Sequence, residues 1–146
     1  MNGPKSFFLF KTFTILIIAV LLATPPFLAG CSGVLAKNEP VPVQITPGKV
    51  YEILKDQTQK VKYTILDVRI VEEFDAGHLD SAVLIPVDDL ETRFAELDKN
   101  KPVIVYCRSG RRSAKAAATL VSKGFSPVYD MTGGIESWTD KGYPVE

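Results

Sequence analysis

The fold of this chain is decided by residues 103–118, which read VIVYCRSGRRSAKAAA. The first four residues are β-branched or aromatic and follow a proline, so they predict a short buried strand over 103–106. The alanine-rich run from Arg112 favours a helix, and Gly124 is suited to end it. Cys107 is therefore predicted to lie in a tight turn, at the carboxyl end of a strand and above a helix N-terminus. In open α/β sheets, ligands bind at this position.

This position predicts a reactive thiol at Cys107. A free cysteine has a pKa of about 8.5, and a helix N-terminus with neighbouring arginines lowers it to roughly 3.5–7.5. Arg108, Arg111 and Arg112 all follow within five residues, and Gly110 lets the backbone curl without a Cβ clash. The unpaired N–H groups of the first helical turn also face the loop, which suits an anion or an anionic sulfur chain. The alternative is a buried structural cysteine before a turn.

The segments on either side alternate between strand and helix patterns. Thr46-Pro47 is a typical helix start, Asp88 and Glu91 have the spacing of a capping box, and residues 57–60 are predicted as a loop. Strands alternating with helices at these lengths predict an α/β fold with three layers, in which an open, mostly parallel sheet has helices on both faces. The predicted strands are 61–66, 82–86, 103–106 and 127–131, and the predicted helices begin near residues 46, 72, 88, 112 and 134.

Residues 1–30 differ in composition from the rest of the chain. They contain Lys5 and Lys11, no acidic residue, and an apolar run over 15–23, which is the pattern of a secretory signal peptide. The alternative is a retained membrane-spanning anchor, for which the run is short, since a span needs about 20 residues. Residues 28–31, LAGC, resemble the bacterial lipobox, in which the cysteine is acylated and becomes the first mature residue.

This resemblance predicts a lipid on Cys31 and divides the chain into a lipoprotein signal peptide (1–30), a tether (31–43) and a folded domain (44–146). The predicted location is extracytoplasmic, on the periplasmic side of a bacterial membrane and held there by the lipid. Cys107 is then the sole thiol of the mature chain, so it is either well buried or kept for chemistry. The 17 basic and 17 acidic residues balance, which argues against a nucleic-acid partner.

Residues 107–113, CRSGRRS, resemble the active-site loop of the rhodanese-type sulfurtransferases, whose pattern is Cys-x-x-Gly-x-[Arg/Ser/Thr]-[Ser/Thr]. In that family the cysteine takes a sulfane sulfur from an anionic donor such as thiosulfate, holds it as a persulfide, and passes it to cyanide or a thiol. The resemblance covers about residues 46–146 and implies a rhodanese-like fold that needs no metal or organic cofactor. It implies that Cys107 is catalytic and that the following residues bind the donor: Arg108, Ser109, Gly110, Arg111 and Arg112.

Two further motifs carry the same resemblance. Asp67-Val68-Arg69 precedes residues 73–79, EFDAGHL, as the family's "Asp-Val-Arg" precedes its "Glu-Phe-x-x-Gly-His-Ile". Asp67 and Arg69 are expected to be supporting residues. One interpretation is that they steer the donor or fix the active loop. The interpretation that we favour is a buried ion pair that joins loops. Residues 133–138, GGIESW, resemble the closing signature of the family. There we expect Trp138 in the core, and a simple turn at the two glycines rather than a close approach to the cysteine loop.

The sequence leaves three alternatives to a sulfurtransferase. It also leaves the oligomeric state open. Tyrosine phosphatases use Cys-x5-Arg, whereas here Arg112 gives Cys-x4-Arg and Tyr106 replaces the usual histidine, so a phosphatase or arsenate reductase is the weaker reading. A non-catalytic module for sulfur relay or binding could keep the same fold. The third alternative is thiol–disulfide redox chemistry, in which Cys107 would have to form a disulfide with another molecule because the chain has no Cys-x-x-Cys.

Overall fold

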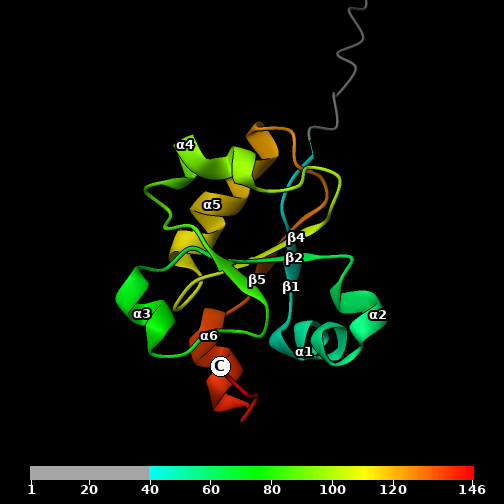
Figure 1. Cartoon of the computed structure of the whole chain (residues 1–146), viewed down its shortest axis with the longest axis vertical. Coiled ribbons are helices and arrows are strands. Elements are labelled where there is room, and N and C mark those ends of the chain that lie inside the picture. The colour runs from blue at the N-terminus through cyan, green and yellow to red at the C-terminus, as the bar shows by residue number, and fades with distance from the viewer. Residues whose placement is uncertain (1–39) are drawn as a thin grey trace, which may run out of the picture. The chain divides into compact units, whose positions relative to one another are not determined.

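Five parallel strands form the centre of the domain in the computed structural model, which describes residues 40–146 (Figure 1). Their order in the sheet is β1-β5-β4-β2-β3, and every neighbouring pair is parallel. The predicted α/β fold with a parallel sheet is thus confirmed. The strands are β1 (Val43–Ile45), β2 (Thr64–Asp67), β3 (Ala82–Leu84), β4 (Val103–Tyr106) and β5 (Val128–Met131). The predicted signal peptide, Cys31 and most of the predicted tether lie outside the described residues.

Helices cover both faces of the sheet, as predicted, because the side chains of each strand alternate between them. Along β4, Val103 and Val105 pack with α4 and α5, whereas Ile104 and Tyr106 pack with α1 and α6. Each face therefore has its own hydrophobic core. The helices are α1 (Pro47–Lys55), α2 (Gln57–Lys60), α3 (Val71–Asp75), α4 (Leu90–Arg93), the 3-10 helix η1 (Phe94–Glu96), α5 (Arg111–Ser122) and α6 (Gly134–Asp140).

The two helices with the clearest end signals begin or stop as predicted. The Thr46 side chain accepts a hydrogen bond from the N–H of Lys49 and caps α1. Just after the C-terminus of α5, Gly124 has a φ of +87°, and the N–H of Phe125 donates to the carbonyl oxygen of Leu120 at 3.0 Å. This reversal satisfies a free carbonyl group of the helix and places Phe125 in the core.

Three local predictions are wrong. β1 was not predicted, because it is three residues long and only Ile45 among them is buried. The predicted loop at 57–60 is α2, which begins because the Asp56 carboxylate accepts from the N–H of Thr58 at 2.8 Å. The predicted capping box at Asp88 does not form in the described chain. The residue before α4 is Asp89, whose φ of −90° and ψ of −14° are helical rather than extended.

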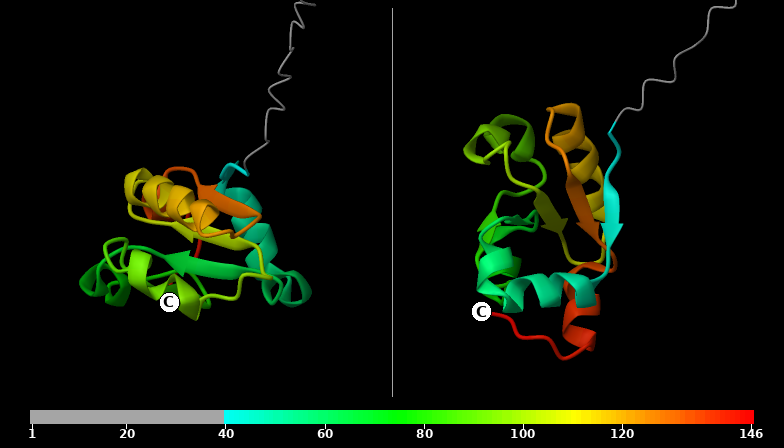
Figure 2. Two further views of the ribbon diagram at one scale, coloured as in Figure 1. Left: turned by 90° about the horizontal axis from the view of Figure 1, so that it is seen from above. Right: turned by 90° about the vertical axis from the view of Figure 1, so that its right-hand side faces the viewer.

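Because all five strands are parallel, their carboxyl ends lie together at one end of the sheet. In the right-hand view of Figure 2, the cyan residues 40–43 enter at the opposite end, and the red-orange α6 lies beyond the carboxyl ends. The loop after β4, the loop after β2 and the start of α6 therefore meet at one place. None of the helices between residues 40 and 146 has the length and hydrophobicity of a bilayer-spanning segment.

Candidate active site

The end of β4 positions Cys107. All four residues of β4 are buried, and Cys107, which follows directly, is only 1% exposed. The loop then turns at Gly110, whose φ of +106° is the left-handed conformation that favours glycine, and α5 begins at Arg111. The N–H of Gly110 points back at the sulfur and donates to Sγ at 3.1 Å. The predicted placement, a cysteine between a strand end and a helix N-terminus, is confirmed.

Hydrogen bonds make the Cys107 thiol more acidic than an ordinary cysteine. Burial of the sulfur by itself raises its pKa, since it disfavours the thiolate. The N–H groups of Ser113, Gly110 and Ser109 and the Ser113 hydroxyl act in the opposite direction, and the net pKa lies below the ordinary value. The environment therefore favours a thiolate inside a cup of N–H groups.

Ser113 is a site residue that the sequence analysis did not single out. Its side chain is buried in the first turn of α5, and its hydroxyl donates to the carbonyl oxygen of Gly110 at 3.0 Å. A hydroxyl group has one hydrogen, so it can serve either this carbonyl oxygen or the thiolate. The sequence signal that pointed to Ser113 was the Ser/Thr at the last position of the loop motif.

The three loop arginines point in different directions. The Arg112 guanidinium binds the Glu73 carboxylate through two hydrogen bonds of 2.6 and 2.7 Å, which are the main reason that its pKa is raised. The charge of Cys107 raises the pKa of Arg112 further, so this arginine lies within electrostatic reach of the thiolate. Arg108 instead turns to Glu136, with 2.7 Å between Nε and Oε1, and Arg111 is exposed. The three arginines are thus not all gathered around the sulfur: Arg112 lies within reach of it, whereas Arg108 is held by Glu136.

Asp67 and Arg69 form the buried ion pair that the sequence analysis favoured. Their side chains are 0% and 6% exposed, and Nη2 of Arg69 lies 2.6 Å from a carboxylate oxygen of Asp67. Nη2 also donates to the carbonyl oxygen of Gly77 at 2.7 Å. Burial lowers the pKa of Arg69, but its bonds and its attraction to Asp67 outweigh this, and the net pKa is raised. The pair therefore joins the end of β2 to the loop after α3.

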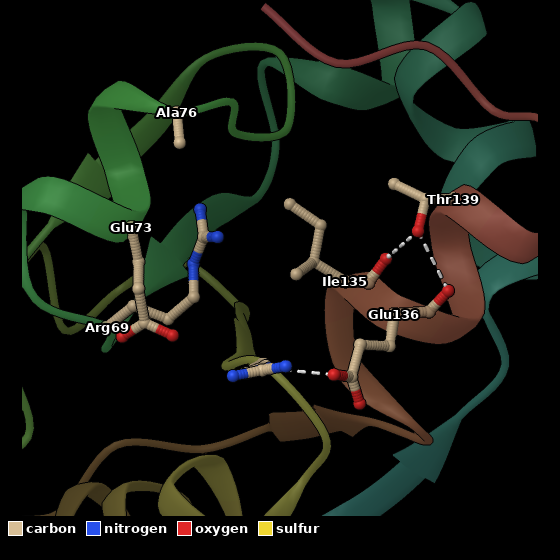
Figure 3. Close-up of a pocket in the computed structure, with 7 residues that line it drawn as sticks. Arg69, Glu73, Ala76, Ile135, Glu136 and Thr139 are labelled. Atoms are coloured by element: carbon tan, nitrogen blue, oxygen red, sulfur yellow. Dashed lines mark hydrogen bonds and ion pairs between the residues drawn. The ribbon is translucent and has the colours of Figure 1, made fainter.

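An open cleft of about 290 Å³ lies beside the Cys107 loop. Figure 3 shows Arg69, Glu73 and Ala76 on one side of it and the residues of α6 on the other. Charged and apolar groups share the lining, so the cleft suits a small polar or ionic molecule better than a large apolar one. Its lining residues are Arg69, Glu73, Ala76, Arg108, Ile135, Glu136 and Thr139.

The start of α6 approaches the cysteine loop closely, and the expectation of a simple turn at the two glycines is wrong. Gly134 has a φ of +60°, and a Cβ at this position would lie 2.5 Å from the carbonyl oxygen of Arg108. A side chain there would overlap the loop backbone. Trp138 is in the core as expected, with its indole N–H donating to the carbonyl oxygen of Pro144 at 2.9 Å.

The fold and this site define a class of α/β domain in which one cysteine sits in an amide-lined loop at the carboxyl edge of a parallel sheet. The chain belongs to the rhodanese-like domain family, whose model matches residues 46–141, and so to a family of sulfurtransferases.

Known proteins of this family resemble the chain over most of the described domain. YrkF of Bacillus subtilis, a proposed sulfur carrier protein by its name, is 42% identical to this chain over 77 residues. The matched residues make up 53% of this chain and only 42% of the length of YrkF. The thiosulfate sulfurtransferase GlpE of Coxiella burnetii is 35% identical over 95 residues, covering 65% of this chain and 85% of GlpE. The crystal structure of a rhodanese-related protein from Thermoplasma volcanium superimposes with a TM-score of 0.64 at 35% identity, covering 71% of this chain and 97% of that one.

Proposed function

We propose that this protein transfers a sulfane sulfur from an anionic donor such as thiosulfate to cyanide or a thiol, through a persulfide on Cys107. One observation carries the proposal: the Cys107 sulfur sits among inward-facing N–H groups, with the Gly110 N–H 3.1 Å away. These donors stabilise the thiolate that must attack, and they would also stabilise an anionic persulfide sulfur. The similarity to a named thiosulfate sulfurtransferase supports the choice of donor.

The proposed reaction is a double displacement without a net redox change. The Cys107 thiolate attacks the sulfane sulfur of thiosulfate; a new S–S bond forms, the S–S bond of the donor breaks, and its electron pair leaves with sulfite. Arg108, which lines the cleft, and Arg112, which lies within electrostatic reach of the thiolate, draw in the donor and stabilise the leaving sulfite. The acceptor then attacks the outer sulfur, the persulfide bond breaks, and the Cys107 thiolate is restored.

A mass measurement tests the first half of this cycle. After incubation with thiosulfate in the absence of reductant, we expect the intact protein to gain the mass of one sulfur atom, located on the peptide that contains Cys107. Cyanide should remove the added mass, because it attacks the outer sulfur. Protein that has kept its fold but gains no sulfur from thiosulfate would contradict the proposal.

A sulfur-relay module is the second candidate, and the similarity to YrkF favours it. Such a module would accept sulfur on Cys107 from a partner protein but would show no turnover with small molecules. Steady-state assays with thiosulfate, mercaptopyruvate and an aryl phosphate distinguish the possibilities. Ping-pong kinetics with thiosulfate and cyanide would support the enzyme, and hydrolysis of the aryl phosphate would support the phosphatase reading.

For the segment before residue 40, we propose a lipid anchor on Cys31 and a location on the periplasmic side of a bacterial membrane. The support is the sequence pattern alone: a basic start, an apolar run and the LAGC tetrapeptide. When the full chain is expressed in bacteria, a labelled fatty acid should be incorporated, and the Cys31→Ser variant should lose the label and leave the membrane fraction. An unlabelled wild-type chain in the soluble fraction would contradict the anchor.

A further inference from the structure

We infer that the first turn of α6, Gly133–Glu136, is a positioning element for the Cys107 loop and that Gly134 is its essential residue. This inference rests on the proposed function insofar as it concerns the use of the loop. The turn acts through the loop backbone, which it holds in the orientation that directs N–H groups at the sulfur.

Two hydrogen bonds tie the loop to α6. The N–H of Ile135 donates to the carbonyl oxygen of Cys107 at 2.9 Å, and the N–H of Glu136 donates to the carbonyl oxygen of Arg108 at 3.1 Å. The N–H groups in the first turn of a helix have no partner within that helix. The first turn of α6 therefore uses its free donors on the cysteine and on the residue that follows it.

The geometry of the peptide bond connects these contacts to the sulfur. In a trans peptide the C=O and N–H groups point in opposite directions. Because the carbonyl groups of Cys107 and Arg108 face α6, the N–H groups of Arg108 and Ser109 must face away from α6 and into the loop. The N–H of Ser109 is one of the donors that lower the pKa of the Cys107 thiol. The α6 contacts and the cup of N–H groups are thus two sides of the same peptide units.

Gly134 permits this approach for a steric reason. Its ideal Cβ would overlap the backbone carbonyls of both Cys107 and Arg108, so any side chain must push the loop and the helix apart. The helix is the less movable partner, because Ile135 and Trp138 anchor it in the core between α1 and the sheet. The loop would be displaced, and its N–H groups would turn with it.

The test compares Gly134→Ala with Gly142→Ala. Gly142 has a φ of +70°, close to the +60° of Gly134, but apart from its two chain neighbours no residue of the described chain comes within 4 Å of its ideal Cβ. Both variants introduce the same left-handed strain, and only Gly134→Ala adds the overlap with the loop. The measurement is the rate of Cys107 alkylation by iodoacetamide as a function of pH, which follows the thiolate fraction. A second measurement is the rate of sulfur transfer from thiosulfate to cyanide.

In the wild-type protein and in Gly142→Ala, alkylation should reach half its maximum at a pH below that of free cysteine, since the Cys107 pKa is lowered. In Gly134→Ala this midpoint should rise. Below the midpoint, each unit of the rise slows alkylation about tenfold at a given pH, and sulfur transfer should fall with it. A folded Gly134→Ala protein with the wild-type midpoint would overturn the inference.

A second pair of variants applies even if Gly134→Ala does not fold. Glu136→Pro removes the N–H that binds Arg108 at a first-turn position, where proline is tolerated, whereas Glu136→Gln keeps that N–H and removes the carboxylate. We expect the alkylation midpoint to rise in Glu136→Pro but not in Glu136→Gln, because removing a negative charge does not disfavour the thiolate. Equal midpoints in the two variants would overturn the inference. Alkylation does not require sulfur transfer, so a wild-type chain with a low midpoint but no persulfide would contradict the proposed function instead.

Discussion

Replacing Cys107 by serine is expected to abolish turnover with thiosulfate, with a loss of at least about a thousandfold. A serine hydroxyl is not ionised at neutral pH, and it cannot hold a sulfane sulfur as a persulfide. The domain should still fold, because serine is close to cysteine in size and the N–H of Gly110 can donate to its oxygen as it does to Sγ. The change therefore removes the reacting atom and leaves its surroundings in place.

Two measurements complete the Cys107→Ser experiment. The urea midpoint of unfolding shows whether the variant is folded, and the mass after thiosulfate treatment shows whether sulfur is bound elsewhere. A folded variant that retains a tenth of the wild-type turnover would show that the sulfur does not pass through Cys107. A variant that loses turnover and also unfolds at much lower urea would need Cys107→Ala as a second comparison.

Replacing Asp67 by alanine is expected to destabilise the domain by about 3–5 kcal/mol. The change removes the partner that binds two guanidinium nitrogens and the backbone N–H of the buried Arg69, and it leaves a positive charge in a site that is almost closed to water. It also frees the loop after α3, which Arg69 holds through the Gly77 carbonyl oxygen. This loss is large compared with the total stability of a domain of this size, about 5–15 kcal/mol.

Equilibrium unfolding in urea measures this effect, and Glu52→Gln provides the control. The Lys49–Glu52 pair has nearly the same separation, 2.8 Å, but both of its side chains are more than 60% exposed, so we expect no measurable change in the free energy of unfolding. If Asp67→Ala also left stability unchanged, water in the adjoining cleft, which Arg69 lines, would be hydrating the guanidinium. The pair would then not be structural, and steering of the donor would become its stronger interpretation.

The sequence predicted the elements that rest on a strong local pattern. β4 has the predicted bounds and α5 begins one residue before the predicted start, since a short apolar strand, a glycine turn and an alanine run all agree. β2 begins three residues later than predicted, because Val61 is exposed in the turn before it despite its β-branched side chain. β1 and α2 were missed because both are short, and their stability comes from neighbours and one cap rather than from their own composition.

At the site, the position of Cys107 was predictable, whereas the partners of its loop were not. Arg112 binds a residue 39 positions away, and Arg108 binds one 28 positions away. Nothing in the spacing of CRSGRRS indicates which way each guanidinium turns. The same holds for Gly134, whose role depends on how closely α6 packs against a backbone that lies far from it in the sequence.

The recessed position of Cys107 has a consequence for molecular size in the proposed cycle. Because only 1% of the residue is exposed, little of the sulfur is open to an incoming donor, which favours small molecules. A persulfide places its terminal atom about 2 Å beyond the cysteine sulfur, the length of an S–S bond. Acceptors would therefore meet a more protruding atom than donors do, and they can be considerably bulkier.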